Sequence, residues 1–333
     1  LCTPERATAA AAVGRGFLPW GGRPAPVFAY RRAVPSDTRS RTLAFPVVVL
    51  LVSVTATAGV LVSVRQAVRR QDADRFHVAA DRVQDSIQDR LATYIALLRA
   101  TAGLRDAAAM DTRAFRQYAE RLEMQRRYPG VQGIGFSQRI RADEVEPVVN
   151  RLRASGNPTF RIWPDQPRDE YHSIIHLEPP DQRNLAALGY DMFTEPTRHE
   201  AMARARDTGE PAVSGVVTLV QEIDEAKQPG FLIYLPVYEG GGVPGNVEAR
   251  RERLTGFVYS PFRAGDLFAG ILGSNPRPRA GFELYDGPAA GGALLYRTQR
   301  LPPRAQQTER QIHVGGRAWT ARIFALPALT ETS

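Results

Sequence analysis

The chain has 333 residues, of which 43% are hydrophobic and 23% charged, and its formal net charge is +8 at pH 7. Residues 1–41 carry +5 of that charge, from seven arginines against Glu5 and Asp37, so the rest of the chain, at +3, does not indicate a nucleic-acid partner. The single cysteine is Cys2, which excludes a disulfide framework from the remainder.

A long apolar run follows the basic tail. Residues 42–64 contain no charge, and a bilayer core about 30 Å thick needs about 20 apolar residues in a helix. We therefore predict a transmembrane helix here, with Pro46 in its first turn. By the positive-inside rule, residues 1–41 form a disordered cytoplasmic tail, and the rest is periplasmic or extracellular at the inner (plasma) membrane. A cleaved signal peptide is the alternative, because Ala56-Thr57-Ala58 resembles a cleavage site.

The next stretch, residues 65–125, is expected to contain a long stalk helix and a second helix. Within 66–101 apolar residues recur at helical period, and Asp111 is a plausible N-cap for a helix over 112–126. The stripe is compatible with the core helix of a globular domain and with a signalling stalk that pairs with its copy in a homodimer. Its members are Phe76, Ala80, Val83, Ile87, Leu91, Tyr94 and Leu98.

Two successive mixed modules follow, a larger one at 126–250 and a smaller one at 254–327. Short strands alternate with helices and Gly-rich turns in both, which predicts an α+β fold. We expect helices at 143–154, 195–208 and 261–271, and a loop at 239–251. The expected strands are 131–137, 160–163, 172–177, 212–220, 230–238, 254–259, 281–285, 294–297, 311–314 and 319–324.

Several short pieces in this region form a recognisable series. They are Gly189-Tyr190-Asp191, Arg198, Ala205–Gly209, Ser214, Gly230-Phe231, Pro236–Tyr238, Gly256–Arg263 and Leu267. In order and spacing the series resembles the CHASE domain, the extracytoplasmic sensory module of histidine kinases and of cyclic-nucleotide signalling enzymes. The resemblance covers roughly residues 75–327, and it rests on the whole series because no single piece is specific.

The resemblance implies a long helix carrying two PAS-like modules, with a small-molecule ligand in the membrane-distal one at 126–250 and the membrane-proximal one at 254–327. It also implies a homodimer and a second membrane span leading to an output domain of histidine kinase or diguanylate cyclase type. No long apolar run and no catalytic motif of such an output follow residue 64. We therefore expect an anchored sensor fragment of a two-component or cyclic-nucleotide signalling receptor.

The resemblance also implies ligand-binding residues. In the cytokinin-binding members an acidic residue recognises the adenine ring, and its place falls on Arg198, which favours an anionic ligand instead. The alternative is that Arg198 pairs with Asp191 or Glu195 inside the fold. A pocket threonine falls on Ser214 and a pocket leucine on Val220. Phe231 and Tyr234, on the strand at 230–238, complete the predicted site, although side chains three apart on a strand face opposite ways.

No other pattern predicts chemistry. His172 and His176 are four apart, but the residues between them favour a strand, so we expect no metal site. We also expect no cofactor and no catalytic residue, since neither Ser214 nor Ser260 has the frame of a nucleophile elbow. The alternatives to a sensor are a membrane-tethered extracytoplasmic enzyme and a non-binding scaffold module.

Overall fold

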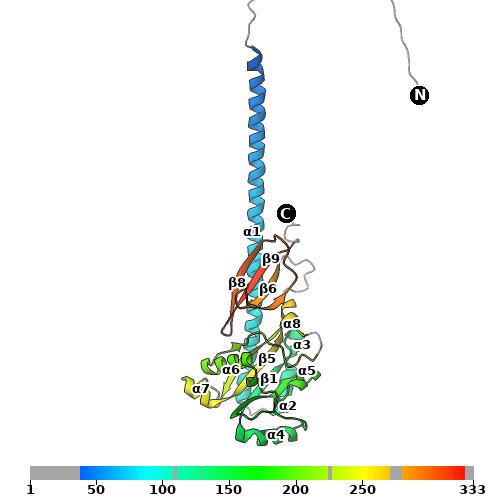
Figure 1. Cartoon of the computed structure of the whole chain (residues 1–333), viewed down its shortest axis with the longest axis vertical. Coiled ribbons are helices and arrows are strands. Elements are labelled where there is room, and N and C mark those ends of the chain that lie inside the picture. The colour runs from blue at the N-terminus through cyan, green and yellow to red at the C-terminus, as the bar shows by residue number, and fades with distance from the viewer. Residues whose placement is uncertain (1–37, 108–110, 129, 224–226, 271–279, 327–333) are drawn as a thin grey trace, which may run out of the picture. The chain divides into compact units, whose positions relative to one another are not determined.

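The computed structural model describes residues 38–107, 111–128, 130–223, 227–270 and 280–326, and residues 1–63 and 64–333 form two compact units. The first helix, α1, runs from Thr38 to Ala107 (Figure 1). Because it begins at Thr38, Pro46 lies inside the helix and not in its first turn, which corrects the predicted start. The rest of the predicted tail lies outside the described residues.

The N-terminal part of α1 is apolar and exposed. Every side chain from Phe45 to Val64 is exposed, and the helix from Phe45 onward is long and apolar enough to cross a membrane. It is the one such helix in the described part of the chain. Exposed apolar surface of this extent is typical of a membrane contact, and it coincides with the predicted span at 42–64.

The stalk part of α1 packs against its own chain. All seven residues of the predicted stripe are buried in one hydrophobic core. Tyr94 contacts Phe262 of the first sheet, with ring centroids 5.0 Å apart, and Gln84 donates a hydrogen bond to the Gln311 carbonyl of the second sheet. The stripe is therefore a core face within the chain, and the homodimer stays a prediction.

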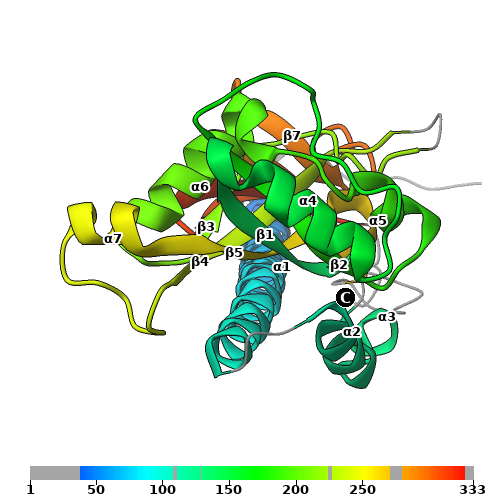
Figure 2. The same cartoon turned by 90° about the horizontal axis from the view of Figure 1, so that it is seen from below.

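The first sheet has five antiparallel strands in the order β2-β1-β5-β4-β3. Side chains alternate between the two faces along each strand. One face therefore packs against α1 and the other against α6. Figure 2 shows this arrangement from below. The strands are β1 (Ile134–Arg141), β2 (Glu170–Glu178), β3 (Ala212–Val213), β4 (Gly230–Tyr238) and β5 (Leu254–Arg263).

Short helices surround this sheet. They are α2 (Thr112–Arg121), α3 (Met124–Arg127), η1 (Ala142–Glu144), α4 (Val145–Ala154), α5 (Gln182–Ala187), η2 (Met192–Thr194), α6 (Pro196–Thr208), α7 (Val247–Arg253) and α8 (Ala264–Ala269). The helix predicted at 112–126 is broken at Glu123, whose φ of 48° is left-handed. The loop predicted at 239–251 ends in α7, which Asn246 caps by accepting from the Ala249 N–H.

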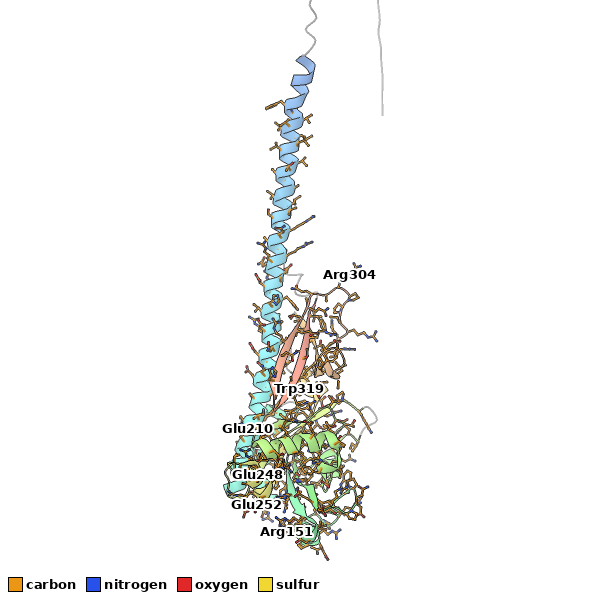
Figure 3. All side chains as sticks on the ribbon, turned by 60° about the vertical axis from the view of Figure 1, so that its left-hand side comes forward. Arg151, Glu210, Glu248, Glu252, Arg304 and Trp319 are labelled. Carbon is orange, nitrogen blue, oxygen red and sulfur yellow. The ribbon has the colours of Figure 1, made fainter. Side chains whose placement is uncertain are left out.

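The second sheet has four antiparallel strands in the order β7-β6-β9-β8. Its centre is the fully buried Trp319 on β9, which belongs to the same core as the α1 stripe (Figure 3). The strands are β6 (Ala280–Asp286), β7 (Ala293–Arg297), β8 (Gln307–Val314) and β9 (Arg317–Ala325).

The mixed α and β fold is thus confirmed, with corrections to its parts. Residues 254–263 form β5 inside the first sheet, so Pro261 lies in a strand and not in a helix. The strand predicted at 160–163 is absent apart from a bridge between Trp163 and Tyr190. The first correction concerns the central strand of the first sheet, since β5 lies between β1 and β4, and the second removes a predicted strand outside that sheet.

Candidate functional site

Helix α6 places Arg198 against the first sheet. Pro196 occupies its first turn, and the Glu195 carboxylate accepts hydrogen bonds from the N–H groups of Thr197 and Arg198. This is the cap that the orphan donors of a helix N-terminus need. Gly209 ends the helix with a left-handed φ of 76°. The buried stripe consists of Arg198, Ala201, Met202 and Ala205, so the guanidinium lies on the core face of the helix.

The Arg198 side chain is only 2% exposed and is incompletely paired. Its Nη2 donates a hydrogen bond of 3.1 Å to the Thr218 carbonyl oxygen, and its guanidinium carbon stands 5.3 Å from the centre of the Tyr190 ring. Its Nε lies 3.8 Å from Glu195 Oε2, beyond hydrogen-bond reach, and makes no hydrogen bond in the described structure. A buried guanidinium normally has more partners than this.

The sheet surface near Arg198 carries two buried tyrosines. Tyr234 on β4 is directly opposite Tyr259 on β5, and their ring centroids are 6.1 Å apart. Burial raises the pKa of both phenols, and the positive charge of Arg198 opposes that rise. The Tyr234 hydroxyl lies 3.7 Å from Met192 Sδ, whereas the Tyr259 hydroxyl makes no hydrogen bond within the described residues.

Ser214 lies at the end of β3 with its hydroxyl already engaged. Its Oγ donates to the Gly215 carbonyl at 2.8 Å and accepts from the Leu232 N–H at 3.0 Å. The side chain therefore completes the ladder between β3 and β4 where the regular pairing stops. The Oγ lone pair that remains can accept one more hydrogen bond.

Val220 and Phe231 lie on different sides of the sheet. Val220 packs, half-buried, against the core cluster that contains Tyr234 and Tyr259. Phe231 belongs to the core on the α1 side, where its ring stacks on Phe262 at 5.0 Å. The structure thus brings Arg198, Val220 and Tyr234 together, places Ser214 at the strand edge beside them, and separates Phe231 from all four.

The site around Arg198 is closed in this structure. Arg198, Tyr234 and Tyr259 are all buried, and two cavities of about 520 Å³ each in the described residues lie elsewhere, beside α2 and beside Trp163. Thr218, whose carbonyl oxygen accepts the hydrogen bond from Arg198, is exposed, whereas the neighbouring Leu219 is buried.

Sequence reasoning missed three residues of this site. Tyr259 lies opposite Tyr234, and pairing the strand 230–238 with 254–263 as a hairpin would have identified it. Tyr190 lies under the guanidinium and belongs to the Gly189-Tyr190-Asp191 piece. The Thr218 carbonyl had no sequence signal, because any residue supplies one.

Of the two acidic partners considered for Arg198, only Glu195 is near. The Asp191 carboxylate instead accepts hydrogen bonds from the N–H groups of His172 and Phe193, and Arg168 Nη1 lies 3.3 Å from it. Asp191 therefore organises the backbone between β2 and η2. Because its own partners hold it there, Glu195, with Oε2 3.8 Å from Arg198 Nε, is the carboxylate near that guanidinium in the described structure.

The described residues thus combine a mixed α and β fold with a long apolar helix, and they bury Arg198, with incomplete hydrogen bonding, against the first sheet. The CHASE domain family model matches residues 108–296, more than half of the chain. The chain belongs to the CHASE domain family, and CHASE domains are extracytoplasmic sensors. The matched range covers all five strands of the first sheet and all of α6.

Among solved structures, the chain is similar to an extracellular ligand binding receptor from Desulfohalobium retbaense. The TM-score is 0.47 at 12% sequence identity, and the match covers 77% of this chain and 40% of that receptor. At that distance the likeness says nothing about what this chain binds. No curated protein matches the sequence.

Proposed function

We propose that this chain is a membrane-anchored sensor that binds a small anionic molecule between α6 and the first sheet. The observation that carries the proposal is the buried Arg198 guanidinium, which among the described residues has one hydrogen-bond partner and an Nε with none. Guanidinium groups bind carboxylate and phosphate through paired N–H donors. The Tyr259 hydroxyl, also unpaired, would donate to the same ligand.

The remaining predicted residues would contribute to ligand binding to different extents. Val220 and Tyr234 would contact the body of the ligand, and Ser214 would offer its one free lone pair from the sheet edge. Phe231 would influence the site only through the β4 backbone, because its ring lies on the opposite face. We further propose two PAS-like modules, with the boundary after Arg263, since β5 belongs to the first sheet.

Signal transmission would start from α6 and pass to the turn between β8 and β9. Arg204, on α6, donates from Nη2 to the Val213 carbonyl at 2.6 Å and reaches the Gly315 carbonyl at 3.5 Å. The Val213 N–H donates to that same Gly315 oxygen at 2.9 Å. A Cβ at Gly315 would stand 2.6 Å from Val213 Cγ2, so the turn fits against β3 only as glycine. A movement of α6 would therefore move the turn.

From the turn, the strands reach the stalk. Arg317 forms a two-contact ion pair with Asp286 at 2.7 Å and lies 3.4 Å from Glu200 of α6. On the adjacent β8, Arg310 pairs with Asp81 of α1 at 3.0 Å. The second sheet is thus bonded to α6 at one end and to α1 at the other. We propose that it converts ligand binding into a displacement of α1, in a homodimer with an output domain of histidine kinase or diguanylate cyclase type.

The test is ligand-induced stabilisation of the full chain in lipid nanodiscs, screened against carboxylates, phosphates, neutral compounds and amines. A ligand at 100 times its dissociation constant should add about 2.7 kcal/mol. Arg198→Met should abolish that gain while leaving the free energy of unfolding of the unliganded chain unchanged or slightly higher, because replacing an incompletely paired buried charge by an apolar chain of similar size is often neutral or stabilising.

Arg322→Met is the matched control, because Arg322 is a partly buried arginine on β9 with carboxylate partners Glu309 and Glu283. It should leave ligand binding intact. Stabilisation by amines alone would overturn the anionic-ligand proposal and keep the sensor. If no compound stabilises the chain, the scaffold alternative is favoured.

A further inference from the structure

A cavity lies at the outer edge of the first sheet, away from the closed site around Arg198. It has a volume of about 520 Å³ and lies between α2, the end of α4 and β2. Figure 2 shows α2 and α4 on either side of β2. This volume is within the range of small-molecule sites. None of its lining residues belongs to the Arg198 site.

The cavity has an apolar floor. It is formed by Leu152, Phe160, Ile175, Leu177, Leu185 and Leu188. Leu185 is 51% exposed, which is high for a leucine and leaves apolar surface open to a ligand. An occupant with a hydrocarbon body would cover this floor and gain the free energy of removing it from water.

The wall contributed by α2 carries separated charges. Arg116 is neutralised by Glu178, with Nε and Oε1 3.1 Å apart, and the Glu178 side chain is 5% exposed at the floor. Arg113 and Glu120 also line the cavity, and neither forms an ion pair in the part of the chain that the structure describes. One unpaired cation and one unpaired anion therefore remain, at opposite ends of the same helix face.

The spacing of these two charges defines the ligand. Arg113 and Glu120 are seven residues apart, which is two helical turns or about 10 Å along the axis. At the Glu120 end the cavity meets a second space of about 280 Å³, which shares Glu120, Glu178 and Pro180 with it. The groove is thus open along its length, and its charges are complementary to a molecule with an anion at one end and a cation at the other.

We propose that this groove binds a small zwitterion with an apolar body and about 10 Å between its carboxylate and its ammonium group. The carboxylate pairs with Arg113, the ammonium group pairs with Glu120, and the hydrocarbon lies on the leucine floor. The proposal does not depend on the Arg198 site, because the two sites share no residue.

The probe is 8-aminooctanoate, whose extended chain separates its charges by about the required distance. Binding to the full chain in nanodiscs is measured by calorimetry. Octanoate and octylamine each lack one charge, and 4-aminobutanoate has both charges too close together. All three should bind more weakly, by up to about fivefold, the effect of losing one exposed ion pair. Equal binding of octanoate and 8-aminooctanoate would overturn the proposal.

Variants of exposed residues test the orientation without threatening the fold. Arg113→Glu and Glu120→Arg should each weaken binding, with the lost ion pair contributing up to about fivefold. The double variant should restore it, because a zwitterion can turn round in the groove. Arg121→Glu, on the same helix but outside the cavity lining, is the control that should bind like the parent. Failure of the double variant to recover binding would overturn the charge assignment.

Discussion

The two faces of the five-stranded sheet have opposite chemistry. On the α1 face, the ring centroids of Phe262 and Trp319 lie 5.0 Å and 5.1 Å from that of Phe231, and the indole N–H, the one polar group of these rings, also makes no hydrogen bond within the described residues. On the α6 face, buried rings alternate with polar groups, among them the Tyr259 hydroxyl and the Arg198 guanidinium, that lack hydrogen-bond partners in the described structure.

This difference indicates that the α1 face contributes mainly to stability and that the α6 face retains groups suited to binding. Polar atoms buried without partners lower stability, typically by about 1–3 kcal/mol each, so a face that served only for packing would gain by losing them. The α1 face has the composition expected of such packing. The α6 face retains polar groups at a cost, which is typical of functional sites. The predictions below test whether the two faces respond differently to comparable changes.

The largest effect is expected on the α1 side from Ile87→Asp. Ile87 is fully buried in the stripe that joins α1 to the sheets. An unpaired carboxylate there should lower the free energy of unfolding by several kcal/mol, as burial of an unpaired charge does. Denaturant titration of the full chain in nanodiscs, followed by tryptophan fluorescence, measures it. Gln88→Asp, at the neighbouring exposed position, is the control and should change little.

The second-largest effect is expected from Phe231→Ala, which should lower the free energy of unfolding by about 3–5 kcal/mol because it leaves a cavity in the α1 face. The same titration measures the loss. At a temperature where the variant is folded, its ligand affinity should equal that of the parent, because the ring is on the far side of β4 from Arg198. Loss of affinity in a fully folded variant would place Phe231 in the site after all.

Much of this contrast could be predicted from the sequence. The period-four stripe from Phe76 to Leu98 predicted the buried face of α1, because helical periodicity reflects burial directly. The helix predicted at 195–208 matches α6 to within a residue. Of the pieces that resemble the CHASE domain, Gly230-Phe231 and Pro236–Tyr238 lie on β4, Gly256–Arg263 lies on β5, and Arg198 lies on α6.

The boundaries of the strands and helices and the residues of the site were harder to predict from the sequence, for physical reasons. Pro261 favours a strand end or helix start locally, but pairing with Leu232 holds it within β5. Phe231 and Tyr234 were grouped by sequence proximity, while strand alternation places them on opposite faces. The carbonyl of Thr218 and the absence of a partner for Arg198 Nε depend on tertiary contacts, which no local pattern encodes.

A smaller change in the free energy of unfolding is expected when the pH is lowered, and it originates on the α6 face. His172 on β2 is fully buried and stacks on Phe193, and burial lowers its pKa. The Glu170 carboxylate lies 2.8 Å from its Nε2, Arg139 pairs with that carboxylate, and Asp191 accepts from the His172 N–H. Because the unfolded chain binds the proton at about pH 6.5 and the folded chain only below that, stability should fall as pH falls through about 6.5.

His172→Phe should therefore flatten the dependence of the free energy of unfolding on pH between about 7 and 5. Denaturant titrations at stepped pH give that slope. His313→Asn, a change at an exposed histidine of the second sheet, should leave the slope as it is. An unchanged slope in His172→Phe would mean that the buried imidazole accepts its proton as readily as in the unfolded chain.

The smallest effects come from two hydroxyl deletions and have opposite signs. The Tyr259 hydroxyl is buried with no hydrogen bond in the described structure, whereas the Tyr238 hydroxyl donates to the Arg206 carbonyl at 2.6 Å. Tyr238→Phe should lower the free energy of unfolding by about 1 kcal/mol, because it leaves that carbonyl without its donor, and Tyr259→Phe should leave stability unchanged or raise it slightly. Thermal unfolding of the two variants side by side measures the difference. If the Tyr259 hydroxyl only packs in the core, Tyr259→Phe will leave ligand binding unchanged. If the hydroxyl donates to the ligand beside Arg198, Tyr259→Phe will weaken ligand binding without lowering the free energy of unfolding. A purely structural role does not produce weaker binding together with unchanged or higher stability.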